Sequence, residues 1–165
     1  MKTLSFIAII IMAGFIPVQS AKIPVQNATS KDWNSQSFWY SPWGKSGVHK
    51  GIDIFAKKGK SVLSSTSGLV IFTGNLSMGG NVIGVLGPKW RVHYYAHLAK
   101  INIQTLSWVS RGDVIGTVGD TGNAAGKPAH LHYSIASLIP YPWRITTQTQ
   151  GWKKMFFMNP TENLN

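Results

Sequence analysis

Short runs of β-branched and aromatic residues, separated by glycines, recur along the middle of the chain. The clearest runs cover residues 68–74, 81–87, 91–98, 114–119 and 130–136. Such runs, with turn residues at intervals of roughly 8–12 positions, are typical of short strands joined by turns. Long helical periodicity is missing from the sequence, and the segment 101–119 could hold one helical turn at most. The pattern predicts a mainly β domain over residues 37–145, with little helix.

The first twenty residues have a different pattern from the rest. Lys2 precedes an apolar run from Leu4 to Val18, and the small residues Ser20 and Ala21 follow. This is the layout of a secretory signal peptide, so we expect residues 1–20 to be removed by cleavage after Ser20. An uncleaved membrane anchor is the alternative, but the apolar run has roughly 15 residues where a spanning helix needs ~20. We therefore expect an exported protein, periplasmic or extracellular at the cell wall, without a stable membrane span after cleavage.

Two further segments flank the β-rich region. Residues 21–36 are polar and mixed, which predicts a linker. Residues 146–165 form a polar C-terminal tail with an apolar cluster from Met155 to Met158. This tail either packs back on the domain or frays.

Composition narrows the possible partners and metal ligands. The chain has 165 residues, enough for one domain, and a formal net charge of +11. A basic surface favours nucleic acid, a membrane or an acidic polymer, although it can also serve solubility alone. Export makes nucleic acid an unexpected partner and leaves an anionic cell envelope. Because the chain has no cysteine, any metal must be held by histidine and carboxylate.

The first candidate site residues are His130 and His132, which are two positions apart in a predicted strand. Side chains at this spacing point to the same face, with Cα atoms roughly 6.5–7 Å apart. The two imidazoles can share one metal, or one can bind it while the other stands beside an open coordination position. Taken alone, such a pair is more often two partly exposed strand histidines.

Two other segments each carry a pair of possible ligands at a spacing of four, His49 with Asp53 and His93 with His97. His49 and Asp53 are separated by Gly51, which lets the chain bend, so we expect His49 on a turn and Asp53 on the following strand. Asp53 stands among apolar neighbours, where a carboxylate is costly unless it is paired or bound to metal. His93 and His97 cannot both reach one centre if they share a regular strand, and their spacing does not say which one is functional.

Two histidines and one carboxylate are a common ligand set for catalytic zinc, which leaves a position for water. Zinc brings the pKa of that water toward ~7 and polarises a carbonyl oxygen. Hydrolysis also needs a base, and the single glutamate, Glu162, lies in the tail. Histidine has a suitable pKa for this role, so the sequence favours a histidine base.

The motifs HKGID (49–53), YYAHL (94–98) and GDTGNAAGKPAHLHYSI (119–135), in this order, resemble the lysostaphin-type (LytM, M23) zinc metallopeptidases. The resemblance covers about residues 41–136. It implies an antiparallel sheet core with an open groove and one zinc ion per chain. It also implies hydrolysis of the peptide cross-links of bacterial peptidoglycan, in stem peptides or cross-bridges, by a protein that we expect to be monomeric.

Carried over by position, the resemblance implies that the zinc ligands are His49, Asp53 and His132. His97 and His130 would then be the catalytic histidines, acting as general base and acid. His93 matches no functional position of the family, and we expect it to be a surface residue of a strand.

The chain also departs from the family pattern. Many relatives have Tyr or Arg shortly before the first ligand, where this chain has Trp43 and Lys45. The sequence therefore does not identify the group that stabilises the oxyanion. After the last ligand, relatives often have Phe-Glu, where this chain has Tyr133 and Ser134.

The alternative function is a non-catalytic, wall-binding or regulatory LytM-like module that activates other hydrolases. The aromatic segment 33–43 either packs over a sheet edge, which we favour, or lines the substrate groove.

Overall fold

The computed structural model describes residues 12, 14, 21–162 and 164. The expected signal peptide, residues 1–20, lies almost entirely outside these described residues. None of the helices found in the described part is long and apolar enough to cross a membrane.

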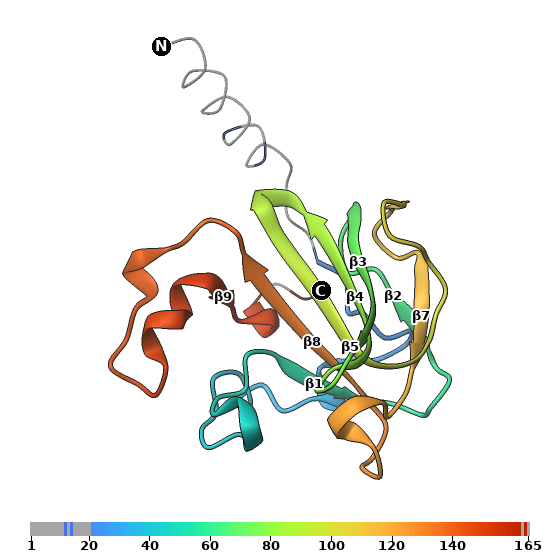
Figure 1. Cartoon of the computed structure of the whole chain (residues 1–165), viewed down its shortest axis with the longest axis horizontal. Coiled ribbons are helices and arrows are strands. Elements are labelled where there is room, and N and C mark those ends of the chain that lie inside the picture. The colour runs from blue at the N-terminus through green and yellow to red at the C-terminus, as the bar shows by residue number, and fades with distance from the viewer. Residues whose placement is uncertain (1–11, 13, 15–20, 163, 165) are drawn as a thin grey trace.

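Strands dominate the described chain, and the helices are short 3-10 turns (Figure 1). The strands are β1 Ile52–Phe55, β2 Ser61–Leu63, β3 Gly68–Leu76, β4 Gly80–Gly87, β5 Arg91–Ile101, β6 Trp108–Val109, β7 Val114–Val118, β8 His130–Ser137 and β9 Phe157–Met158. The 3-10 helices are η1 Ser30–Asp32, η2 Gly44–Ser46, η3 Pro88–Trp90, η4 Gly122–Ala124, η5 Pro142–Arg144, η6 Gly151–Phe156 and η7 Pro160–Glu162. The predicted mainly β class is confirmed.

The strands form one antiparallel sheet in the order β1-β8-β5-β4-β3-β6. β7 pairs with both β5 and β2, and β9 pairs with β8. β8 therefore lies between β1, which follows the first candidate ligand, and β5, which carries the YAHL motif. This arrangement brings three motifs that are distant in sequence to neighbouring strands.

One face of the sheet is covered by the hydrophobic core. Tyr95 and Tyr133 are fully buried there, in ring contact at 5.3 Å, and the Ser65 backbone N–H donates to the Tyr95 hydroxyl at 2.8 Å. Because alternate residues of β8 face opposite sides, Leu131, Tyr133 and Ile135 enter the core while His130 and His132 face away.

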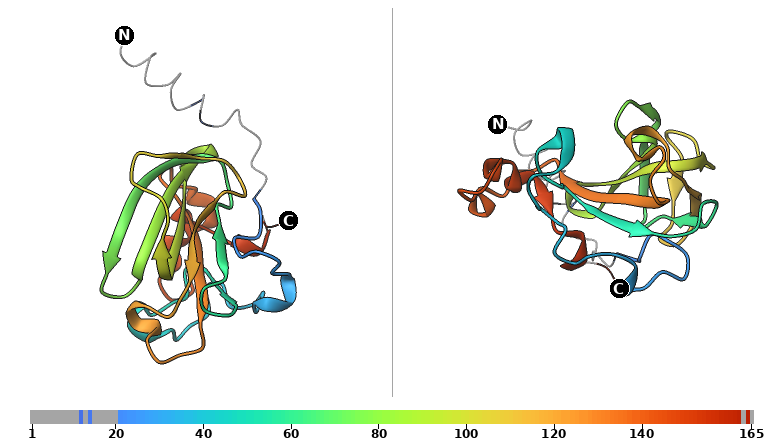
Figure 2. Two further views of the ribbon diagram at one scale, coloured as in Figure 1. Left: turned by 90° about the vertical axis from the view of Figure 1, so that its right-hand side faces the viewer. Right: turned by 90° about the horizontal axis from the view of Figure 1, so that it is seen from below.

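The segments expected to be a linker and a tail both pack on the domain. In the first, Val25 is buried, and the backbone N–H groups of Lys22 and Leu63 donate to Ser65 and Pro24 carbonyls at 2.9 Å. In the second, β9 adds to the sheet with Met158 opposite Ile135. Figures 1 and 2 show this C-terminal segment beside β8, on the side of the sheet away from β2 and β7.

The expectation that His93 is a surface residue is wrong. Its side chain is fully buried, and its Nδ1 lies 2.6 Å from the Tyr133 hydroxyl oxygen. In β5, His93 and Tyr95 point to the core, so strand alternation carries the imidazole inward with its tyrosine neighbour. Burial, with a further contribution from the charge of Arg91, lowers the pKa of His93 to about 3.

This buried histidine should make the fold sensitive to acid. The unfolded chain binds a proton at His93 near pH 6.5, while the folded protein binds it only near pH 3. Stability from this group is complete above pH 6.5 and falls as pH decreases between these values, by about 3 kcal/mol from pH 6.5 to pH 4. Urea unfolding at several pH values should show a shallower loss for His93→Gln than for the unmodified protein. Equal slopes for the two proteins would contradict this assignment.

Candidate metal and active site

Asp53 and His132 lie directly opposite each other on the paired strands β1 and β8. Side chains in this register have Cβ atoms about 4.5–5.5 Å apart. Asp53 Oδ1 lies 2.8 Å from His132 Nδ1. Gly51 allows β1 to come this close, because a Cβ at that position would lie 2.3 Å from the Tyr133 carbonyl oxygen and 3.0 Å from His132 Nε2. We expected Gly51 to provide a bend, and the structure shows that it also provides space.

His49 completes the group from the turn before β1. Its backbone accepts a hydrogen bond from Trp39 N at 2.7 Å and donates one to Tyr40 O at 3.0 Å, which fixes the turn. The ring Nδ1 lies 3.1 Å from the Ser37 carbonyl oxygen, and a carbonyl only accepts, so Nδ1 carries the proton. His49 Nε2 is therefore the ring nitrogen that can serve as a metal ligand, and it lies 3.1 Å from both Asp53 Oδ1 and His132 Nδ1.

These three side chains satisfy the requirements of a metal site. Their candidate ligand atoms all lie within 4.8 Å of one another. Ligand atoms on one tetrahedral zinc at ~2.0–2.1 Å are about 3.3 Å apart, close to the separations found here. Burial alone would raise the pKa of Asp53, but the contacts with His132 and His49 outweigh it and hold the pKa well below its usual range. The group therefore offers an ionised carboxylate and two imidazoles, the donor set that suits zinc.

His97 reaches the same face of the sheet through an irregularity in β5. Tyr94 and Ala96 alternate toward the pocket, so a regular strand would turn the next residue to the core. At His97 the backbone instead adopts φ 63°, and the pairing registers of β5 with β4 and β7 shift around it. Such a bulge redirects a side chain. The structure thus answers which of the two β5 histidines faces the site, a question that spacing left open.

Two further contacts orient the His97 ring. The backbone N–H of His97 donates to Gly79 O at 2.7 Å, and the ring Nδ1 donates to Thr121 O at 2.9 Å. Thr121 is fixed in turn, since its hydroxyl accepts from Asn81 N and donates to Leu98 O, both at 3.0 Å. Burial, together with the neighbouring His132 and His130, lowers the pKa of His97 to about 4. The ring is therefore neutral near pH 7, with Nε2 free to accept a proton.

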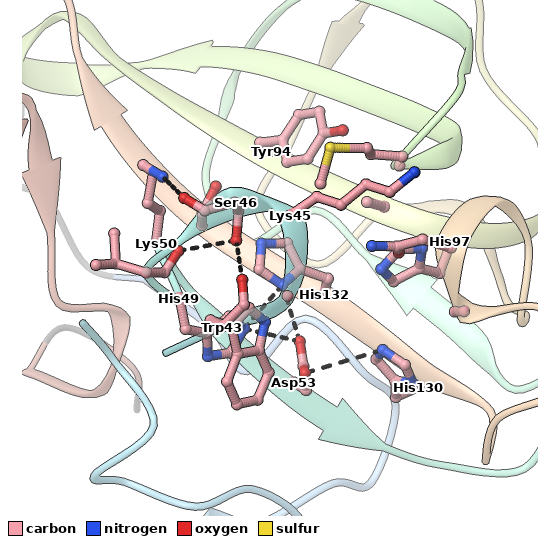
Figure 3. Close-up of a pocket in the computed structure, with 18 of the residues that line it drawn as sticks. Trp43, Lys45, Ser46, His49, Lys50, Asp53, Tyr94, His97, His130 and His132 are labelled. Atoms are coloured by element: carbon pink, nitrogen blue, oxygen red, sulfur yellow. Dashed lines mark hydrogen bonds and ion pairs between the residues drawn. The ribbon is translucent and has the colours of Figure 1, made fainter. Parts of the chain in front are cut away.

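His130 is held in the same manner at the start of β8. Its Nδ1 donates to the Pro128 carbonyl at 2.8 Å, so Nε2 is the accepting nitrogen, and it lies 4.0 Å from Asp53 Oδ2. The His130 ring is 5.0 Å from the His97 ring and rests against Phe55 at 5.4 Å. Figure 3 shows His97 and His130 beside the group formed by His49, Asp53 and His132.

All five side chains border one open pocket with a volume of about 780 Å³. Sequence reasoning missed Tyr94, which lines it from β5, and Phe157, which lines it from the C-terminal segment. The alternation of β5 could have indicated Tyr94, but no local signal places Phe157. Lys45 also lines the pocket, as a positive charge near the site (Figure 3).

The aromatic segment before His49 serves two purposes. Trp43 lines the pocket and stacks on the His49 ring, with centroids 4.1 Å apart and planes 20° apart. Trp39 is instead buried and packs against Phe157. The groove-lining role thus applies to Trp43, and the packing role that we favoured applies to Trp39.

Comparison with known proteins finds similarity to bacterial peptidases. The family model for peptidase family M23 matches residues 47–140. The L-Ala--D-Glu endopeptidase of Bacillus subtilis is 39% identical over 67% of this chain and 39% of its own length. The peptidoglycan DD-endopeptidase ShyA of Vibrio cholerae is 36% identical over 53% of this chain and 20% of its own. The chain thus spans well under half the length of these relatives.

A solved structure extends the comparison to the fold. The catalytic domain of lysostaphin from Staphylococcus simulans superposes with a TM-score of 0.61, covering 82% of this chain and 97% of that domain at 23% identity. The matched family region runs from just before His49 to just beyond β8 and contains all five candidate site residues. The chain therefore belongs to peptidase family M23.

Proposed function

We propose that this protein is a zinc-dependent endopeptidase that hydrolyses peptide cross-links of bacterial peptidoglycan. The observation that carries the proposal is the convergence of His49, Asp53 and His132, with the accepting nitrogens of His97 and His130 directed to the same pocket. The peptidoglycan DD-endopeptidase of Vibrio cholerae and the L-Ala--D-Glu endopeptidase supply the substrate class by similarity. A substrate of this kind requires an exported enzyme.

The residues suggest a division of roles. His49, Asp53 and His132 would hold one zinc ion per chain, and zinc bound there would polarise the scissile carbonyl and acidify a water molecule. His97 and His130 each donate Nδ1–H to a backbone carbonyl, which fixes the tautomer and leaves Nε2 facing the reacting atoms. One of these Nε2 atoms would take the proton of the attacking water, and the imidazolium formed in this way would return that proton to the leaving amine, directly or through the other ring. Lys45 adds positive charge to the same pocket.

Removal and restoration of the metal test this proposal. We expect the purified protein to contain one zinc per chain and to release soluble fragments from purified peptidoglycan. Treatment with a chelator should abolish the release, and added zinc, but not magnesium, should restore it because two of the three ligands are imidazoles. Mass analysis of the fragments from walls with different cross-links would identify the bond.

A specific result would contradict the proposal that this protein is an enzyme. If the protein binds one zinc per chain and binds the wall, yet releases no fragment from any wall under any metal condition, it is a non-catalytic module. The same outcome together with activation of a separate wall hydrolase would establish the regulatory alternative.

A further inference from the structure

A second hollow lies beside the candidate active site, with a volume of about 520 Å³. Its lining comes from two segments that flank the sheet, and consists of Gln36, Phe38, Trp39, Tyr40, Ser41, Gln148, Thr149 and Lys154. Both segments lie outside residues 47–140, the region shared with the family. The volume of the hollow falls in the range of small-ligand sites, roughly 300–1,000 Å³.

The wall of this hollow is a fixed part of the structure. Trp39 is buried, and its indole N–H donates to the Thr149 carbonyl at 3.1 Å. The Lys154 ammonium group lies 5.6 Å from the Trp39 ring and donates to Gln148 Oε1 at 2.6 Å. These contacts join the aromatic segment before His49 to the C-terminal segment, so the two halves of the lining are held against each other.

The hollow is coupled to the catalytic pocket through shared walls. Tyr40, in the hollow, contacts Trp43 edge to face at 6.2 Å, and Trp43 stacks on the candidate ligand His49. On the other side, Trp39 packs at 5.9 Å against Phe157, which lines the catalytic pocket. Gln150 Nε2 also donates to Ser46 O, on the rim of that pocket, at 2.9 Å. The two openings therefore lie on either side of a common wall, and no described residue lines both.

The chemistry of the lining selects a class of ligand. Of the three aromatic rings, Tyr40 is 56% exposed, whereas Trp39 is buried and has the Lys154 ammonium over its ring. Two glutamine amides and two hydroxyls offer hydrogen bonds. Lys154 supplies one cation, and no carboxylate occurs among the described lining residues. The exposed Tyr40 ring next to neutral donors and acceptors matches a pyranose ring, which has an apolar C–H face and a rim of hydroxyl and amide groups. An extended peptide would instead require a free strand edge or deep apolar pockets.

We propose that this hollow is an accessory subsite that binds the glycan strand to which the cleaved peptide is attached. The inference rests on the proposed function, since a peptidoglycan substrate brings sugar and peptide to one site. It predicts that the protein distinguishes glycan-linked peptides from free peptides of the same sequence.

Paired substrates provide the test. One is a cross-linked stem peptide still attached to tetrasaccharide glycan, and the other is the same peptide after its sugars are removed. For the unmodified protein we expect kcat/KM to be about three- to tenfold higher with the sugar-bearing substrate. Tyr40→Ala and Gln148→Ala should each reduce this ratio toward one. Trp108→Ala and Lys100→Ala, which remove an exposed ring and an exposed charge from other parts of the sheet, should retain it.

A binding measurement separates failure of the subsite from failure of the proposed function. Peptide-free glycan strands should bind the unmodified protein and bind Tyr40→Ala several-fold more weakly, whether or not either substrate is cleaved. A ratio of one together with no binding of peptide-free glycan would overturn the subsite. Binding of sugar-free peptide multimers or anionic lipid vesicles at Tyr40, in place of glycan, would also overturn it.

Discussion

Replacement of His132 by alanine is expected to remove both the bound zinc and the hydrolytic activity. His132 Nδ1 lies 2.8 Å from Asp53 Oδ1 and 3.1 Å from His49 Nε2, so this ring contributes one of three converging donor atoms. Loss of one donor leaves two, which do not fix a tetrahedral ion. We expect zinc affinity to decrease at least about 100-fold, because even changes in groups behind the ligands cost 10–100-fold. Metal content after gel filtration and competition with a zinc-binding dye would measure the decrease.

The control for this experiment is a histidine of the same sheet that faces the core. His93→Gln removes an imidazole that is buried against Tyr133, on the opposite side of the sheet from the candidate ligands. This substitution should change the pH dependence of the stability and leave the metal content at one zinc per chain. If His132→Ala retains its zinc, or if His93→Gln loses it, the ligand assignment is wrong.

Metal binding should also stabilise the folded protein. Asp53 and His132 join β1 to β8, and His49 joins the preceding turn to both strands. A ligand that binds only the folded state raises its stability by RT ln(1 + [L]/Kd), about 4 kcal/mol at a thousandfold excess over Kd. The unmodified protein should therefore melt at a higher temperature with zinc, while His132→Ala should show little change.

The local sequence predicts the strands of this protein well. Runs such as 81–87 and 114–119 combine β-branched residues with flanking glycines, and the structure has β4 and β7 at these positions. Each run is short and ends where a turn is required, so strand propensity and turn chemistry agree. The grouping of His49, Asp53 and His132 depends instead on the register of β1 with β8, which a family resemblance implies but spacing alone does not.

The residues that sequence reasoning misplaced, missed or left open depend on tertiary structure. The bulge at His97 changes which side of β5 faces the pocket, and a regular alternation does not reveal it. The same alternation sends His93 to the core, where its polar nitrogen finds the hydroxyl of Tyr133 from another strand. Phe157 joins the pocket because β9 pairs with β8, a contact between segments about twenty residues apart that carries no motif.

Replacement of the catalytic candidates should separate turnover from metal binding. His130→Ala removes an imidazole whose Nε2 faces the pocket but lies 4.0 Å from the nearer Asp53 oxygen, outside the group of converging donors. For His97 the suitable variant is Asn, because φ is 63° there and asparagine tolerates this conformation better than alanine. We expect both variants to retain one zinc per chain and to lose about 10²–10⁴-fold in kcat, the range of a lost general acid or base.

The pair of variants is informative because the two rings have the same kind of support. Each donates its Nδ1–H to a backbone carbonyl, of Thr121 for His97 and of Pro128 for His130, so each presents a fixed accepting nitrogen. If one ring served only to pack the pocket, its replacement would lower the melting temperature with little loss of kcat. Metal content, melting temperature and kcat of the two variants distinguish these cases. Zinc loss from His130→Ala equal to that from His132→Ala would contradict the division between a ligand and a proton-transfer group within one strand.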